Sequence, residues 1–299
     1  MKHFELKEKV PVNGFEGWYT RFTDEDKNIN IAVIFAKTTY HKDPHGFIQI
    51  YDGIRKNNDY FRFDLSEFKA TDEGVFLKDN HLSLTQMSID VGDYQFQISW
   101  SKPVQNTYKS AMGFLERLPL ETFQEVVLMQ ASFQGTFSYQ DKALKVQGKA
   151  YMEKTYGRKF PRTWFWLQAN HFREPSLSIS MSGGHVPTLF LRPFGFFVLL
   201  YTADKTYRFA TYNLARFKYR VLRDAYIMEV KKGRYYLHVE VRNHAPVTLV
   251  GPKDQGDMSL PVYECINATT TITLQKNKKT ILHDTSEWAG FEWMMKGAS

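Results

Sequence analysis

The most regular feature of the chain is an alternation of apolar and polar residues with a period of two. In residues 94–100 (YQFQISW) every second residue is apolar, as in an antiparallel strand with one buried face. Similar patterns predict strands at residues 29–36, 46–51, 60–64, 81–91, 127–138, 163–172, 205–212, 226–231, 235–241 and 268–274. Residues 194–201 (FGFFVLLY) are too few to span a bilayer and predict a buried strand. A helix is expected only around residues 111–126 and near the C-terminus.

Turn sequences separate these predicted strands and indicate the fold class. Examples are Asp52-Gly53, Glu73-Gly74, Gly92-Asp93, Gly183-Gly184 and Lys232-Gly233. Many short strands with frequent turns predict an all-β protein of the sandwich or barrel type. Because 299 residues are many for one small barrel, we expect two antiparallel β-barrel domains with few short helices, at residues 1–165 and 166–299. No linker, repeat or low-complexity segment marks the boundary.

Composition adds an unusual number of aromatic rings and a modest positive charge. The chain has 24 Phe, 17 Tyr and 6 Trp, and such rings suit strands and cavity walls. Its 39 Lys and Arg exceed its 32 Asp and Glu by only seven, and they are scattered apart from short clusters at residues 231–234 and 276–279. This favours a solvated surface around a β core over nucleic-acid binding. Attraction to an anionic membrane surface is a weaker alternative, relevant if the substrate is a lipid.

The cysteine count and the first residues bear on location. A single cysteine, Cys265, excludes an intramolecular disulfide, and the opening residues contain no apolar segment of a signal peptide, so we expect a cytoplasmic protein. Cys265 has no nearby His or Cys in the sequence and is expected to be a small buried hydrophobe. The signatures of phosphate loops, dinucleotide folds, serine hydrolases and zincins are absent.

Two segments combine Trp, Tyr, Gly and a carboxylate more densely than a structural strand requires. The first is residues 15–22 (FEGWYTRF) and the second is residues 148–172 (GKAYMEKTYGRKFPRTWFWLQANHF). A strand at 163–172 would place two indoles and two amides on one face, the composition of a ligand-cavity wall. That face carries Trp164, Trp166, Gln168 and Asn170, while Phe165, Leu167, Ala169 and His171 face the other side.

Each dense segment also contains a candidate acid. Glu153 shares a strand face with Tyr151, and Glu16 shares one with Trp18. A carboxyl group beside rings in a barrel interior would be desolvated, which raises its pKa and lets it hold a proton near neutral pH. The alternative is that either glutamate is a buried structural carboxylate held by Arg21 or Lys154.

The two segments resemble the signature blocks of the tocopherol cyclase family, which have an FEGWY-type opening and a GxGYxEKxWGxxFPxxWxWxQxNxF-type block. The matching residues are Phe15, Glu16, Gly17, Trp18, Tyr19, Gly148, Tyr151, Glu153, Lys154, Gly157, Phe160, Pro161, Trp164, Trp166, Gln168, Asn170, His171 and Phe172. Weaker similarity at residues 118–123 and 251–258 extends the resemblance over most of the chain. Like the related carotenoid hydratase-like proteins, that family is associated with two lipocalin-like β domains.

Three positions depart from the family pattern. Tyr156 stands where the family usually has Trp, Ala150 where it usually has Gly, and Gln124 where it usually has His. Lys154 and Arg158 match or neighbour the block, and we expect them to anchor the turn between the two strands.

The resemblance implies an isomerase that closes a chromanol ring on a hydrophobic prenylated quinol, without a redox cofactor or metal. A general acid would protonate the prenyl alkene, and the phenolic oxygen would trap the cation. Glu153 is the leading proton donor, and Glu16 and Glu121 are the alternatives. Trp18, Tyr19, Tyr151, Trp164 and Trp166 would form the aromatic wall, with Gln168 and Asn170 orienting the ring hydroxyls.

Two other functions fit the same sequence. One is a lipocalin-like carrier that binds a lipid without a poised acid, in which case all the cavity carboxylates would be ion-paired. The other is a β-rich scaffold protein with filled barrels.

Overall fold

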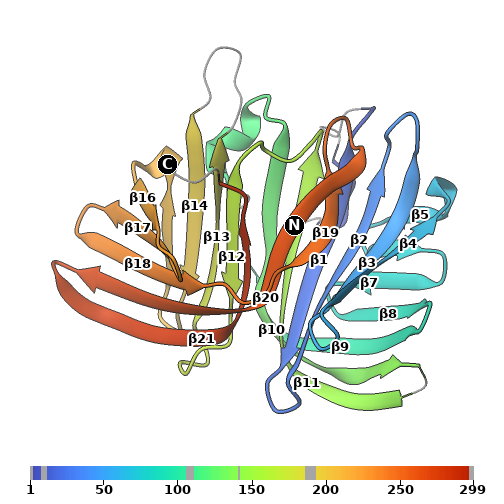
Figure 1. Cartoon of the computed structure of the whole chain (residues 1–299), viewed down its shortest axis with the longest axis horizontal. Helices are drawn as coiled ribbons and strands as arrows, with labels where there is room; N and C mark the ends of the chain where they lie inside the picture. Colours follow the sequence, from blue (N-terminus) through green and yellow to red (C-terminus); the bar gives the residue numbers. More distant parts are fainter. Residues whose placement is uncertain (1–2, 8–11, 106–110, 141, 186–192, 296–299) are drawn as a thin grey trace. The chain divides into compact units, whose positions relative to one another are not determined.

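The fold was analysed in a computed structural model that describes residues 3–7, 12–105, 111–140, 142–185 and 193–295. The described residues form 21 β-strands and three short 3₁₀ helices, arranged in two antiparallel, barrel-shaped sheets (Figure 1). The predicted all-β class is therefore confirmed, and each sheet belongs mainly to a separate compact unit.

The first unit contains an 11-stranded sheet with the strand order β4-β3-β2-β1-β11-β10-β9-β8-β7-β6-β5. Its strands are β1 (Phe15–Asp24), β2 (Ile29–Thr38), β3 (His45–Asp52), β4 (Asn57–Phe63), β5 (Phe68–Ala70), β6 (Gly74–Leu77), β7 (Asn80–Ser83), β8 (Gln86–Val91), β9 (Tyr94–Gln105), β10 (Thr122–Tyr139) and β11 (Lys142–Gly157), with the 3₁₀ helix η1 (Leu65–Glu67) before β5. Strands that follow one another in the chain pair with each other, except for β4 and β5, which stand at the two ends of the order. In addition, β1 pairs with β11.

The second sheet has the order β15-β14-β13-β12-β21-β20-β18-β17-β16, and β19 pairs with β20. Most of this sheet lies in the second unit, but β19 from residue 249 and β20 up to residue 261 belong to the first unit. The elements are η2 (Gly113–Arg117), β12 (Trp164–Ala169), β13 (Ser178–His185), β14 (Phe194–Tyr201), β15 (Thr206–Ala210), η3 (Thr211–Asn213), β16 (Arg216–Val221), β17 (Tyr226–Lys232), β18 (Tyr235–Arg242), β19 (Val247–Pro252), β20 (Met258–Lys276) and β21 (Lys279–Trp293). As in the first sheet, every pairing with a defined register is antiparallel.

Each sheet encloses its own apolar core, as the period-two pattern predicts. In β9 the residues Tyr94, Phe96, Ile98 and Trp100 are buried in the first core, while the intervening polar residues are exposed. In the second unit Phe165 is fully buried and stacks on Phe217, with ring centroids 5.0 Å apart and an interplanar angle of 3°. The apolar interiors therefore hold each sheet in its barrel shape.

The structure also confirms two more specific predictions, the buried strand at residues 194–201 and the burial of Cys265. The apolar run at residues 194–201 forms β14 with the predicted limits. Cys265 is free and 1% exposed, and its Sγ donates a hydrogen bond to the carbonyl oxygen of His244 at 2.9 Å. It is thus a small buried hydrophobe, as expected.

The predicted helices at residues 111–126 and near the C-terminus are wrong. Within the described ranges there is no α-helix, and residues 111–126 contain only η2 and the start of β10. Pro119 disfavours helical backbone at Leu118, whose φ of −78° and ψ of 156° are extended. The described part near the C-terminus is β21, and in the described residues no helix is long and apolar enough to cross a membrane.

Each compact unit is built from three separate stretches of the chain. The first comprises residues 1–109, 121–160 and 249–261, and the second comprises 110–120, 161–248 and 262–299, so the division differs from continuous domains that meet at 165. Residues 249–261 are anchored in the first unit, because Gly256 N donates to the carbonyl of Arg158 at 2.8 Å and Thr38 Oγ1 donates to the carbonyl of Gly256 at 2.6 Å. Gly256 has a φ of +84°, and a Cβ there would lie 2.4 Å from the oxygen of Gly14.

We predict that Phe165→Ala lowers the free energy of unfolding by about 3–5 kcal/mol, because it removes a fully buried ring and leaves a cavity. The control Val221→Ala, at a residue 44% exposed, should change stability by less than about 1 kcal/mol. Urea denaturation followed by circular dichroism measures both. Equal effects of the two substitutions would show that the second core does not stabilise the sheet.

Candidate functional site

The pairing of β1 with β11 brings the two dense sequence segments together. In their antiparallel register Trp18 lies opposite Lys154, and Tyr19 lies opposite Glu153. β10 pairs with the other edge of β11 and places Val126 opposite Glu153. Because side chains alternate across a sheet, neighbouring pairs point to opposite faces, and the two candidate glutamates are separated in this way.

The face of β11 that carries Glu153 points away from the apolar core of the first unit. The alternate residues Ala150 and Met152 lie in that core, whereas Tyr151 and Glu153 lie on the opposite face of the strand. Both are nevertheless buried, with exposed fractions of 0% and 6%. The predicted sharing of a face is confirmed, but Glu153 does not lie in the barrel interior.

Two neutral donors orient the carboxyl group of Glu153. The hydroxyl of Tyr151 donates to Oε2 at 2.6 Å, and Nε2 of Gln124 donates to the same oxygen at 2.9 Å. When the group is neutral, an Oε2 that accepts two hydrogen bonds acts as the carbonyl oxygen, so the proton resides on Oε1. Gln124, one of the three departures from the family pattern, thus contacts the leading acid directly.

Glu16 lies inside the first barrel, on the same face of β1 as Trp18, and forms a buried ion pair. Its Oε1 is 2.5 Å from Nζ of Lys154, and both side chains are 1% exposed or less. Oε1 also accepts the backbone N–H of Lys7 at 3.1 Å, and Lys154 donates to the carbonyl of Glu5 at 2.7 Å. Burial lowers the pKa of Lys154, and the charge of Glu16 opposes that shift.

The interior site is closed by residues 3–7 and by aromatic rings. Phe4 is 1% exposed and stacks on Trp18 at 5.8 Å, and the indole N–H of Trp18 donates to the carbonyl of His3. Nζ of Lys154 lies 4.4 Å from the ring centroid of Trp18. The structural alternative for Glu16, a carboxylate held by Lys154, is therefore what the structure shows, and Lys154 lies in mid-strand rather than at a turn.

Glu121 has different surroundings at the start of β10. Its Oε1 pairs with Nζ of Lys159 at 3.0 Å, with the two side chains 27% and 28% exposed. Its carbonyl accepts the backbone N–H of Arg158 at 2.7 Å, next to the contact of Arg158 with Gly256. Arg158 thus anchors, through its backbone, the segments at residues 118–123 and 251–258 that carry the weaker resemblance.

In the second unit the predicted face of β12 is confirmed. Phe165, Leu167 and Ala169 belong to the apolar core, so Trp164, Trp166 and Gln168 share the opposite face. Nε1 of Trp164 donates to Oε2 of Glu292 at 2.6 Å. Asn170 follows the end of the strand, and its Oδ1 lies 2.9 Å from Nδ1 of His171.

Gln168 is the most unusual residue on this face. Its side chain is 0% exposed, and neither its Oε1 nor its Nε2 has a hydrogen-bond partner. A buried polar group without a partner costs about 1–3 kcal/mol. An amide retained in this state is available to a ligand that both donates and accepts.

The predicted aromatic wall is divided among three places. Trp18 lies inside the first barrel, Tyr19 and Tyr151 lie on the face that carries Glu153, and Trp164 and Trp166 belong to the second unit. The strand faces could be read from the sequence. Which face points to the core depends on the pairing of distant strands, which the sequence pattern does not give.

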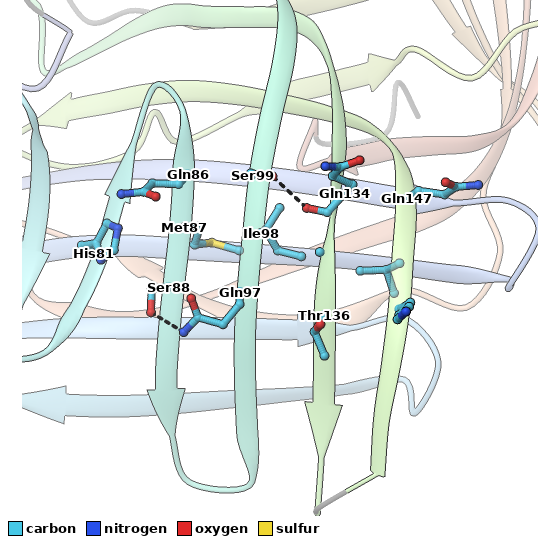
Figure 2. A pocket seen from close by; sticks show the side chains of 13 residues that line it. His81, Gln86, Met87, Ser88, Gln97, Ile98, Ser99, Gln134, Thr136 and Gln147 are labelled. Carbon is cyan, nitrogen blue, oxygen red and sulfur yellow. Dashed lines mark hydrogen bonds between the residues drawn. The ribbon is translucent and has the colours of Figure 1, made fainter.

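Sequence reasoning missed a polar pocket of about 500 Å³ on β7 to β11 of the first unit (Figure 2). Its lining residues are His81, Gln86, Met87, Ser88, Gln97, Ile98, Ser99, Gln134, Gly135, Thr136, Lys145, Val146 and Gln147. The sequence did contain an indication of this pocket, because many of the polar residues in the alternating pattern of these strands carry amide or hydroxyl groups. The lining holds no carboxyl group, so this pocket is suited to hydrogen bonding and not to delivery of a proton from an acid.

The described residues offer no cluster of three or more His, Cys, Asp or Glu that could hold a metal ion. His45 lies four residues after His41 in the sequence, and its Nδ1 is 2.8 Å from the carbonyl of Asp43 and its Nε2 2.8 Å from the hydroxyl of Tyr60. Its ring nitrogens are thereby engaged within the fold.

Comparisons with known proteins bear on the family. The family model described as tocopherol cyclase-like matches residues 93–293, about two thirds of the chain. No curated protein sequence matches. Among solved structures, kievitone hydratase from Nectria haematococca superposes with a TM-score of 0.57 at 12% identity, covering 96% of this chain and 92% of that chain.

Two further solved structures share the fold. CghA has a TM-score of 0.60 at 9% identity, covering 96% of this chain and 90% of that chain. A protein assigned as AttH from Nitrosomonas europaea has a TM-score of 0.56 at 14% identity, covering 93% and 92%. At these identities the likeness establishes the two-sheet fold alone.

We predict that the folded protein needs both partners of the ion pair between Glu16 and Lys154, because a buried charge without its partner is destabilising. Lys154→Met leaves a buried carboxylate without its cation and should lower the free energy of unfolding by about 3–5 kcal/mol. Adding Glu16→Gln to that variant should recover much of the loss, because the uncompensated charge is then gone. The control Arg242→Met, in a pair with Glu240 whose side chains are 57% and 32% exposed, should cost less than about 1 kcal/mol.

Chemical denaturation of the wild type, Lys154→Met, the double variant with Glu16→Gln, and Arg242→Met measures these changes in stability. A Lys154→Met variant as stable as Arg242→Met would contradict the interpretation of Glu16 as a charged, structurally held carboxylate.

Proposed function

Because the chain belongs to the tocopherol cyclase-like family, we propose that it is a cofactor-free isomerase that adds a phenol oxygen to the alkene of a hydrophobic, prenylated quinol. The observation that carries this proposal is the buried carboxyl group of Glu153, oriented by the hydroxyl of Tyr151 and the amide of Gln124. Acid catalysis of ring closure needs one positioned proton donor and a dry, aromatic setting.

The proposed reaction conserves all atoms and electrons. Glu153 donates the proton on Oε1 to the less substituted carbon of the alkene, which leaves a tertiary carbocation on the other carbon. The phenolic oxygen attacks that cation and forms the C–O bond of the new ring. The phenolic proton then returns to the carboxylate of Glu153, so the product is an isomer of the substrate.

Aromatic faces would stabilise the cation. Tyr19 lies opposite Glu153 on β1, and Tyr151 is two residues away on β11. A desolvated ring contributes about 2 kcal/mol to a cation, whereas enzymes lower barriers by about 8 kcal/mol or more. Binding must therefore also fold the flexible tail into a reactive conformation. For the second unit, considered by itself, we propose that Trp164 and Trp166 contact a hydrophobic ligand and that Gln168 and Asn170 bind hydroxyl groups of a ligand.

The other two candidate acids are less suited to this role. Glu16 is held at 2.5 Å by the ammonium group of Lys154, and Glu121 is held at 3.0 Å by that of Lys159. Each of these carboxyl groups is thus committed to an ion pair within the fold. The proposal for Glu153 rests instead on its burial and on the hydrogen bonds from Tyr151 and Gln124 that orient its Oε2.

We predict that Glu153→Gln retains the fold and loses about 10²–10⁴-fold in turnover, because the amide cannot donate the catalytic proton. The assay incubates the protein with a dimethyl-phytyl-benzoquinol in heavy water and analyses the products by mass spectrometry. The wild type should form an isomer that carries one carbon-bound deuterium. The control Glu121→Gln removes a carboxylate that faces Lys159 and should retain turnover.

Other results of this assay would contradict the proposal in distinguishable ways. A fully active Glu153→Gln variant would remove Glu153 from the role of donor. A quinol that is bound and recovered unlabelled would favour a lipocalin-like carrier. A product heavier by one water would show hydration of the alkene in place of ring closure.

We predict that Gln168→Leu separates stability from binding. Because neither amide atom of Gln168 has a partner, the nearly isosteric apolar side chain should raise the free energy of unfolding by about 1 kcal/mol. The same change should weaken quinol binding about tenfold, the equivalent of one hydrogen bond. Thermal unfolding and fluorescence titration measure the two effects, with Gln95→Leu on the exposed face of β9 as the control. A destabilised variant with unchanged quinol affinity would assign Gln168 a purely structural role.

A further inference from the structure

Two basic clusters that are far apart in the sequence lie side by side in the second unit. Residues 231–234 (KKGR) comprise the end of β17 and the turn to β18. Residues 276–279 (KNKK) comprise the turn between β20 and β21 and the strand residue on each side of it. The register of β18 and β20 places Tyr235 opposite Lys276, and the backbone N–H of Asn277 donates to the carbonyl of Arg234 at 2.9 Å. The ends of both hairpins lie next to each other at the left of Figure 1.

A third turn adds another cation to this place. Lys205, between β14 and β15, has Nζ 3.4 Å from the hydroxyl of Tyr235 and 4.2 Å from the ring centroid of Tyr207. The hydrogen bond from Lys205, together with the charges of Lys205 and Lys276, lowers the pKa of Tyr235. We call this set the basic corner, and its members are Lys205, Lys231, Lys232, Arg234, Lys276, Lys278 and Lys279.

Within the part of the chain that the structure describes, ion pairs do not neutralise the charge of the basic corner. Among the described residues, no carboxylate lies within ion-pair distance of any of the seven cations. The nearby acids are Asp204, adjacent to Lys205 in sequence, and Glu229, whose Oε1 accepts the hydroxyl of Tyr236. The chain has 39 Lys and Arg, and removing these seven leaves 32, equal to the number of Asp and Glu. The basic corner is therefore a local concentration of positive charge in the second unit, and no ion pair within the described residues offsets it.

The backbone of the second turn indicates that charge is kept there against local preference. Asn277 and Lys278 have φ values of 51° and 66°, the left-handed conformation of a tight hairpin turn. At the second of these positions glycine is the favoured residue, since it adopts this conformation without strain. A lysine there places an exposed charge at the tip of the hairpin at some cost in backbone energy.

We propose that the basic corner docks the protein on the surface of an anionic lipid bilayer. Clustered lysines and arginines are attracted by anionic lipid headgroups, and tyrosines are enriched at the membrane–water interface. The corner combines its cations with the partly exposed rings of Tyr207 and Tyr235 and with Ile281, which is 44% exposed. The choice of a bilayer over another polyanion rests on the proposed function, because a prenylated quinol is dissolved in membranes.

The test is cosedimentation of the full chain with vesicles. The probes are vesicles of phosphatidylcholine alone and of phosphatidylcholine mixed with phosphatidylglycerol. The wild type should bind the mixed vesicles, bind the neutral vesicles far less, and be released by salt. The triple variant Arg234→Gln/Lys276→Gln/Lys278→Gly should lose about 100-fold in partitioning to mixed vesicles.

A matched control keeps the net charge of the two variants equal. Lys42→Gln/Lys69→Gln/Lys142→Gln also removes three exposed cations, but from the first unit, and should bind mixed vesicles like the wild type. Equal binding by the two triple variants would overturn the proposal. So would a wild type that binds single-stranded oligonucleotides and ignores mixed vesicles.

The readout does not depend on catalysis. If the wild type turns over no quinol yet the basic corner still governs vesicle binding, the proposed function fails and the docking surface stands. If the enzyme is active, the triple variant should retain the activity of the wild type on quinol presented in detergent micelles, where no bilayer has to be bound. Loss of activity in micelles would place these residues in the catalytic machinery and overturn their assignment as a docking surface.

Discussion

The antiparallel register between β1 and β11 is the constraint on which both candidate glutamates depend. With Trp18 opposite Lys154 and Tyr19 opposite Glu153, one set of side chains enters the apolar core and the other leaves it. A slip by one residue would exchange the faces, placing Glu153 in the core and exposing the ammonium group of Lys154 on the other side. The buried pair of Glu16 with Lys154 requires this register, since its charges are compensated only when the two strands meet correctly.

The same register separates two carboxyl groups into two chemical environments. Inside the barrel, Glu16 is bonded to a cation and serves the structure. On the opposite face, Glu153 is oriented by a phenol and an amide, and Gln124, which provides the amide, stands where the family usually has a histidine. An amide fixes the orientation of the carboxyl group but cannot itself release or take up a proton. Any proton exchange at Glu153 must therefore proceed without a titratable partner at that position.

Much of the fold could be predicted from the period-two pattern because it is a local property. The alternation in β9 and the apolar run that forms β14 identify strands whatever their partners are. The face shared by Trp164, Trp166 and Gln168 follows from the same rule. The error at residues 111–126 arose because residues with good helix propensity are followed by Pro119 and by the pairing of β10 with β11, and both override local preference.

The features that could not be predicted all depend on contacts between distant segments. The sequence does not show that Lys154 reaches Glu16 or that residues 249–261 return to the first unit. The same is true of the basic corner, where two short clusters that look unremarkable in the sequence meet because β18 pairs with β20. Strand pairing at long range turns scattered residues into sites, and only the structure reveals it.

The central proposal is that Glu153 holds the proton that is donated to the substrate. Infrared difference spectroscopy of the wild type against Glu153→Gln, in heavy water at neutral pH, tests it most directly. The account predicts that the wild type has the C=O stretching band of a protonated carboxyl group and that this band is absent from the variant. A difference spectrum that shows only the loss of ionised carboxylate bands would contradict it.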